Sequence, residues 1–175
     1  MSERSLMWWA GAAAVVTAAG YFFGLFGPAY YDPVTAFDYL GSFINDATLA
    51  VSGLALIVWS RVTPVRNTGA LILVAGVGLI VWTVGNVLEE IYGLELGTDL
   101  FFAGSITTLA STAVAGILTL FDRTRWRRSG LLLLGLTVGI GVDVIPMFPI
   151  VWTALAVLLA RGWFEEASTP EPARA

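Results

Sequence analysis

The chain has 175 residues, of which 57% are hydrophobic and 13% are charged, and its formal net charge is −4. This composition excludes an ordinary soluble domain, because too few polar side chains are present to cover a core of that size. The sequence contains no Cys, His or Lys, so all nine basic residues are Arg. Disulfides, thiolate and Schiff-base chemistry and the commonest zinc ligand are therefore excluded as well.

Long apolar runs recur along the whole chain, so the expected solvent is a lipid bilayer. The first run, 6–26, is longer than the apolar core of a typical signal peptide, and we interpret it as a retained first span. A second span is expected to end at Trp59, and further runs cover 69–88 and 100–121. The prediction is an all-α integral membrane protein with one domain, 1–164, followed by a disordered cytoplasmic tail, 165–175.

The last apolar stretch, 130–164, allows two interpretations. As one helix it would be about 52 Å long, which is too long for one span and short for two. Pro146 and Pro149 lie near its middle, and Pro breaks helices. We favour a tight hairpin with a fifth span over 130–145 and a sixth over 150–163, giving a compact bundle of six transmembrane helices. The alternative is one kinked helix and five spans.

Basic and acidic residues fall in alternate loops. The loops 61–66 and 122–128 carry arginines, whereas the loops 27–38 and 89–99 carry only acidic charges. Since arginines mark the cytoplasmic side, we expect a multi-pass protein of a prokaryotic plasma membrane with a cytoplasmic N-terminus. The arginines around Trp126 are expected to contact anionic lipid headgroups rather than nucleic acid. These residues are Arg123, Arg125, Arg127 and Arg128.

Small residues recur at one spacing in the odd-numbered spans, which suggests three helical hairpins in the same orientation. The sets are Gly11, Gly20 and Gly27; Gly69, Gly78 and Gly85; and Gly130, Gly139 and Pro146. The alternative is close helix packing, which also uses small residues in membranes. The two explanations are compatible.

A few polar residues fall within or beside the spans at the acidic end. Asp46 is predicted about 12 Å inside the second span, where a carboxylate is a functional candidate by default; the alternative is a hydrated funnel. Asn86 is three residues from Glu89 and four from Glu90, spacings that place it on one helical face with each Glu in turn. The alternative there is an exposed acidic rim. Gly93 is expected to end that helix in a left-handed conformation.

Asp143 is the third candidate, because it has no predicted basic partner. It lies just below the Pro-containing tip in the hairpin interpretation and near mid-membrane in the one-helix interpretation. It should therefore be neutral, hydrogen-bonded or bound to a cation. Asp38 and Asp99, by contrast, precede apolar runs and are expected to cap helix N-termini.

No catalytic or cofactor-binding motif occurs, so we expect no cofactor and do not expect an enzyme. One hypothesis is binding or permeation of a small cation or a proton at Asp46, Asn86, Glu89, Glu90 and Asp143. The other is a non-catalytic scaffold or accessory subunit with a membrane protein partner or a second copy. Convergence of Asp46, Asp143 and one of the two Glu residues on one cavity would favour the cation hypothesis.

Overall fold

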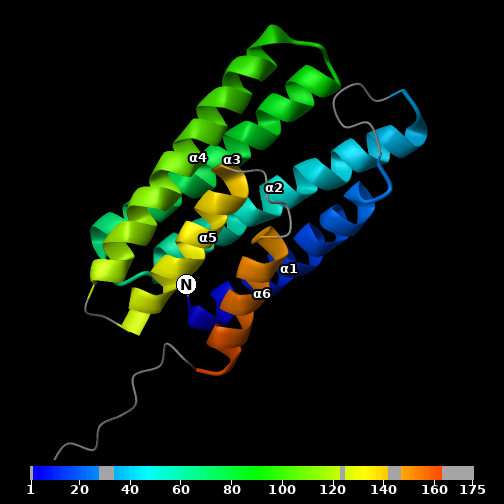
Figure 1. Cartoon of the computed structure of the whole chain (residues 1–175). Coiled ribbons are helices and arrows are strands. Elements are labelled where there is room, and N and C mark those ends of the chain that lie inside the picture. Colours follow the sequence, from blue (N-terminus) through cyan, green and yellow to red (C-terminus); the bar gives the residue numbers. More distant parts are fainter. Residues whose placement is uncertain (1, 28–33, 123–124, 142–146, 163–175) are drawn as a thin grey trace, which may run out of the picture.

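The computed structural model describes residues 2–27, 34–122, 125–141 and 147–162, and these are almost entirely helical. Asp143, Arg123, Pro146 and the predicted tail lie outside the described residues. The elements are α1 (Glu3–Gly24), α2 (Ala36–Val62), α3 (Arg66–Glu90), α4 (Glu95–Phe121), a short 3-10 helix (Arg125–Arg128), α5 (Ser129–Gly141) and α6 (Met147–Ala160). Figure 1 shows their arrangement.

The six α-helices pack in a ring. Each contacts the next along the chain, and α6 returns to contact α1 (Figure 1). Neighbours run antiparallel: on α2 and α3, for example, Gly53 approaches Gly76, and Ser60 near the end of α2 approaches Gly69 near the start of α3. All the odd-numbered helices therefore end at the same face of the bundle.

The first four helices are long and apolar enough to cross a membrane, judged by length and composition. The predicted runs 69–88 and 100–121 lie within α3 and α4, and the second predicted span ends inside α2, whereas the first run, 6–26, extends two residues beyond the end of α1 at Gly24. However, α4 begins at Glu95 rather than near Leu100. The hydrophobic run marked only the apolar part of that helix, whereas acidic residues are also favourable in a first turn.

The last apolar stretch forms two helices that pack against each other, as the hairpin prediction requires. Gly135 on α5 approaches Val151, and Gly139 approaches Met147, so the two helices are antiparallel. The prediction that α6 starts at residue 150 was wrong, because α6 begins at Met147 and contains Pro149 in its first turn. The first N–H groups of a helix have no partner within it, so Pro is tolerated there.

The ends of the helices at the acidic face agree only in part with the predicted caps. Asp38 completes a capping box with Thr35, which is the N-cap of α2. Gly93 has φ +63 and its N–H donates to the Glu89 carbonyl, which confirms the left-handed helix end. The cap predicted at Asp99 was wrong, because the N-cap of α4 is Leu94 and Asp99 lies inside the helix.

Glycines bring the helices close together. The middle glycines of the three predicted sets face the next helix of their own hairpin: Gly20 faces Thr48, Gly78 faces Thr108, and Gly139 faces Met147. This pattern agrees with a repeat but also with small-residue packing, so the threefold repeat stays a prediction.

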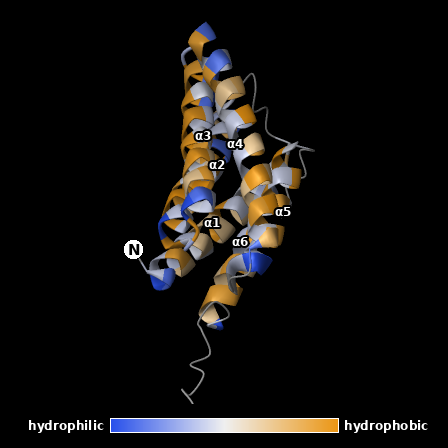
Figure 2. Ribbon diagram, turned by 90° about the vertical axis from the view of Figure 1, so that its left-hand side faces the viewer, coloured by the Kyte–Doolittle hydropathy of each residue, from blue (hydrophilic) through white to orange (hydrophobic). Residues whose placement is uncertain are grey.

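Hydrophobic residues cover the middle of the helices and hydrophilic residues gather toward the ends (Figure 2). Several large apolar side chains are largely exposed, among them Val15 and Phe121. The interior at the arginine-bearing end is filled by Trp59 and Trp152, which are both 0% exposed and meet edge to face with ring centroids 6.2 Å apart. The Trp152 indole N–H donates to the Ser52 hydroxyl at 3.1 Å, which links α6 to α2 across the ring.

Candidate functional site

The ring arrangement brings the acidic helix ends together. Glu90 ends α3 and Glu95 begins α4, at the same face as Asp38 in the first turn of α2. The described arginines lie at the opposite face, for example Arg61 in the last turn of α2 and Arg66 at the start of α3. The predicted separation of charge is therefore present for all the described arginines, and for the described carboxylates other than Glu3 and Asp122, which lie at the arginine-bearing end.

Two hydrogen-bonded pairs join α2 to α3 at the acidic end. The Asn86 amide donates to Oδ1 of Asp46 at 3.1 Å, and both residues are 6% exposed. One helical turn nearer the acidic face, the Ser42 hydroxyl donates to Oε2 of Glu90. We call these four residues the α2–α3 ladder. It is built from residues four apart on each helix, which share a face.

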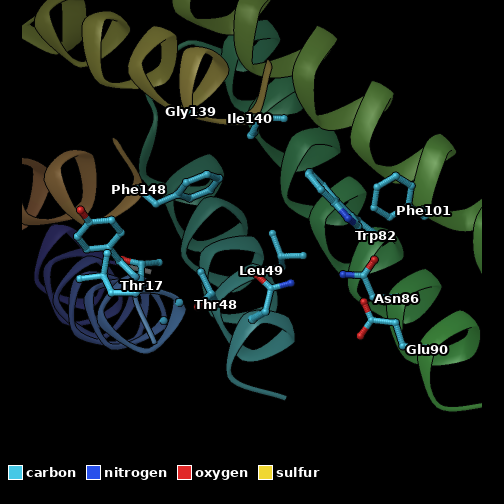
Figure 3. Close-up of a pocket in the computed structure, with 15 residues that line it drawn as sticks. Thr17, Thr48, Leu49, Trp82, Asn86, Glu90, Phe101, Gly139, Ile140 and Phe148 are labelled. Carbon is cyan, nitrogen blue, oxygen red and sulfur yellow. The ribbon is translucent and has the colours of Figure 1, made fainter. Parts of the chain in front are cut away.

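A central cavity of about 340 Å³ lies beside the ladder. Every described α-helix contributes to its wall, with Asn86 and Glu90 among the lining residues. In Figure 3, Trp82, Asn86 and Glu90 follow one another along one face of α3, beside Phe101 of α4, while Phe148 of α6 lies on the other side. The lining residues come from the halves of the helices nearest the acidic face, so the cavity occupies that end of the bundle.

The partners of Asn86 and Glu90 face a different space. Ser42 and Asp46 line a groove of about 350 Å³ on the other side of the ladder, together with Thr83 and Val87. Each hydrogen bond of the ladder thus joins a residue on the groove to a residue on the central cavity. The ladder forms a polar partition between the two spaces.

Glu89 lies apart from the ladder. Its side chain is exposed and lines a smaller cavity of about 190 Å³ between α3 and α4, which Asn86 and Glu90 also border. Of the predicted candidates, Asp46, Asn86 and Glu90 come together in the ladder. Asp46 lines the groove and Glu90 lines the central cavity, so the described residues do not show the expected convergence on one cavity. Asp143 lies outside the described residues, although Gly139 and Ile140 of the preceding helix do line the central cavity.

Sequence reasoning did not single out Ser42, the partner of Glu90. One signal was available, because Ser42 precedes Asp46 by four residues and therefore lies on the same face of α2. The aromatic lining residues Trp82 and Phe101 were also missed, since an aromatic residue in an apolar span gives no separate sequence signal.

The electrostatic environment of the ladder is negative. Asp46 and Glu90 are close enough to interact electrostatically, and their hydrogen-bond donors are neutral side chains. A buried carboxylate costs free energy unless it is hydrogen-bonded, paired or neutralised. Among the described residues, no group of three or more acidic, Cys or His side chains is arranged to hold a metal ion.

The predicted headgroup contacts fall on the opposite face. Arg127 and Arg128 are exposed, Arg125 begins the 3-10 helix, and Arg123 lies outside the described residues. Their contact with lipid stays a prediction.

Comparisons with protein-family models, curated proteins and solved structures found no match for this chain. The chemistry of the ladder and the cavity is therefore the basis for a proposed function.

Proposed function

We propose that the chain is a multi-pass protein of a prokaryotic plasma membrane that binds or conducts a small cation or a proton beside Asp46, Asn86 and Glu90. The observation that carries the proposal is the α2–α3 ladder: two carboxylates, partnered by neutral side chains, between a groove and a central cavity. The described arginines are at the opposite end and cannot neutralise them. A proton or a bound cation can.

The membrane part of the proposal is supported by the distribution of side chains. Four helices have the length and hydropathy of membrane spans, and large apolar side chains point outward along the bundle. On soluble monomers, large apolar side chains are seldom exposed over extended patches. The arginine-bearing face is assigned to the cytoplasm by the positive-inside rule, which places the cavity toward the outer side.

The ladder suits a site that gains and loses positive charge. Intramembrane carboxylates commonly mark ion pathways and proton relays. The Asn86 amide contains both a donor and an acceptor, so it can partner Asp46 whether or not that carboxyl carries a proton. A proton or cation that reaches one carboxylate is within the field of the other.

The test is the thermal stability of the purified chain in detergent, measured across Na⁺, Ca²⁺ and pH. Wild type should be stabilised by at least one of these ions or by acid. Asp46→Asn and Glu90→Gln should remove that response, and Asp143→Asn tests the sequence candidate that lies outside the described residues. Glu95→Gln, an exposed acid at the same end, is the matched control and should respond like wild type.

A stability that is the same in every ion and at every pH, for wild type and variants alike, contradicts the proposal. The alternative, a non-catalytic scaffold or accessory subunit, would then stand. It requires that affinity purification of the chain recover a stable membrane protein partner or a second copy.

A further inference from the structure

We propose that the central cavity binds a small organic ammonium ion, with the Glu90 carboxylate as its counter-charge and the rings of Trp82 and Phe101 against its alkyl groups. This inference rests on the proposed function, because it assumes that the site binds cations. It specifies the class of cation as an organic ammonium ion. It is drawn from the charge, the lining and the size of the cavity.

The charge of the cavity selects a cation over an anion. Glu90 is half-buried and lines the cavity, with its carboxylate held by the Ser42 hydroxyl. No described arginine lines it, because these residues lie at the other end of the helices. An anionic ligand would meet an acidic wall with no compensating donor of positive charge.

The lining of the cavity favours an organic cation over a bare metal ion. Ca²⁺ takes about six to eight oxygen ligands and Mg²⁺ needs a near-octahedral set. The described residues contain no group of three or more acidic, Cys or His side chains that could hold a metal ion. Beyond Glu90 and a few amides and hydroxyls, the wall is aromatic, aliphatic or glycine. Such a wall stabilises a ligand that is itself partly apolar.

Two aromatic rings in the cavity wall beside Glu90 would contact a charged methyl or methylene group of the ligand. Trp82 and Phe101 meet nearly at right angles, with centroids 5.4 Å apart and planes at 82°, and both line the cavity on the same side as Glu90 (Figure 3). Phe148 lines the opposite side. An ammonium group near an aromatic face is attracted by the ring quadrupole, most strongly for Trp and more so where water is excluded.

The size and position of the cavity fit a small ligand entering from the acidic face. A volume of about 340 Å³ is at the lower end of the range for small-molecule sites. The interior toward the arginine-bearing face is occupied by the buried pair Trp59 and Trp152. These two rings therefore separate a ligand in the cavity from the arginine-bearing face.

Isothermal titration calorimetry on the full chain in detergent tests the proposal with a matched pair of probes. Choline carries a quaternary ammonium, and 3,3-dimethylbutan-1-ol has the same shape with carbon in place of nitrogen. Choline should bind wild type at least about tenfold more tightly than the neutral alcohol, a difference of about 1.4 kcal/mol. Glu90→Gln should remove this preference, and Glu95→Gln should keep it.

A second pair of variants tests the aromatic wall independently of Glu90. Trp82→Phe keeps a ring and should retain most of the choline affinity, whereas Trp82→Leu should lose about tenfold or more. Both must retain the helix content of wild type, measured by circular dichroism. Equal choline affinity in the two variants overturns the assigned role of the ring.

The remaining outcomes separate the two proposals. If Na⁺, Ca²⁺ or acid stabilises the chain but choline does not bind, the organic ammonium is overturned and the broader cation function stands. If choline and the alcohol bind equally, the cavity is merely apolar and the inference is overturned. If neither choline nor any ion or pH change has an effect, both proposals fail.

Discussion

Asp46 and Glu90 face different spaces although they lie in one ladder. Asp46 is buried and borders the groove, whereas Glu90 is half-buried and borders the central cavity. Each is held by a neutral donor from the neighbouring helix. The ladder thus fixes two carboxylates in position without neutralising them, which is the property that a cation site needs.

At the residue scale we predict energetic coupling between Asp46 and Asn86. In a double-mutant cycle of Asp46→Ala and Asn86→Ala, the coupling free energy should be about 0.5–2 kcal/mol, because each single change removes the same interhelical hydrogen bond. The measurement is reversible unfolding in mixed detergent micelles. Ser105→Ala is the control, since that hydroxyl bonds only within its own helix, to Phe102, and should not couple to either residue. Strict additivity of the Asp46 and Asn86 effects would contradict the hydrogen bond.

The sequence predicts which residues are unusual but not which partners they find. Asp46 stands out because a span that began there would be too short to reach across the bilayer before Trp59. Its pairing with Asn86 depends on how α2 and α3 are rotated about their axes, and apolar spans define that rotation weakly. The Ser42–Glu90 contact could not be predicted for the same reason. The sequence does show that Ser42 and Asp46, and likewise Asn86 and Glu90, are four residues apart on their helices.

At the scale of elements, the position of Trp82, Asn86 and Glu90 depends on the contact between α3 and α4. An added Cβ at Gly85 would lie 2.5 Å from the Phe101 backbone nitrogen, and one at Gly104 would lie 2.5 Å from that of Trp82. Neither backbone can yield as a flexible side chain would. The two helices must therefore move apart to accept any larger residue at these positions.

We expect Gly85→Ala and Gly104→Ala to destabilise the chain by about 1–3 kcal/mol, because overpacking forces backbone shifts. Gly11→Ala is the matched control: nothing lies within 4 Å of the added Cβ. That change should leave stability unchanged or raise it by about 0.5–1 kcal/mol, since Ala is the better helix former. Thermal denaturation of the three variants measures the difference, and a neutral Gly104→Ala would refute the close α3–α4 contact.

The presence of each helix was predictable from the hydropathy of the sequence, but the residues at which the helices begin were predicted less accurately. The extension of α4 to Glu95 and the start of α6 at Met147 involve polar or proline residues that a hydrophobic run does not include. Such residues are favourable in a first turn because of the helix dipole and the free N–H groups there. The hydrophobic runs therefore predicted the number of helices more accurately than the residues at which the helices begin and end.

At the scale of the whole molecule, the closing contact between α6 and α1 creates the cavity. Pairing of consecutive helices follows from short connections, but nothing in the pattern of apolar residues indicates that the last helix returns to the first. This contact encloses the space that Thr17 on α1, Glu90 on α3 and Phe148 on α6 all line. The cavity thus depends on the closed ring of helices, and the proposed orientation of that ring would decide on which side of the membrane the cavity lies.

The orientation can be measured with single cysteines, because the natural chain has none. Tyr92→Cys lies at the acidic face between α3 and α4, and Pro64→Cys lies between α2 and α3 at the arginine-bearing face; both positions are exposed. In intact bacterial cells expressing each variant, a membrane-impermeant maleimide should label residue 92 directly and residue 64 only after permeabilisation, because arginine-bearing loops stay in the cytoplasm. The reverse pattern would invert the proposed orientation. The central cavity would then face the cytoplasm, and its cation would have to come from inside the cell.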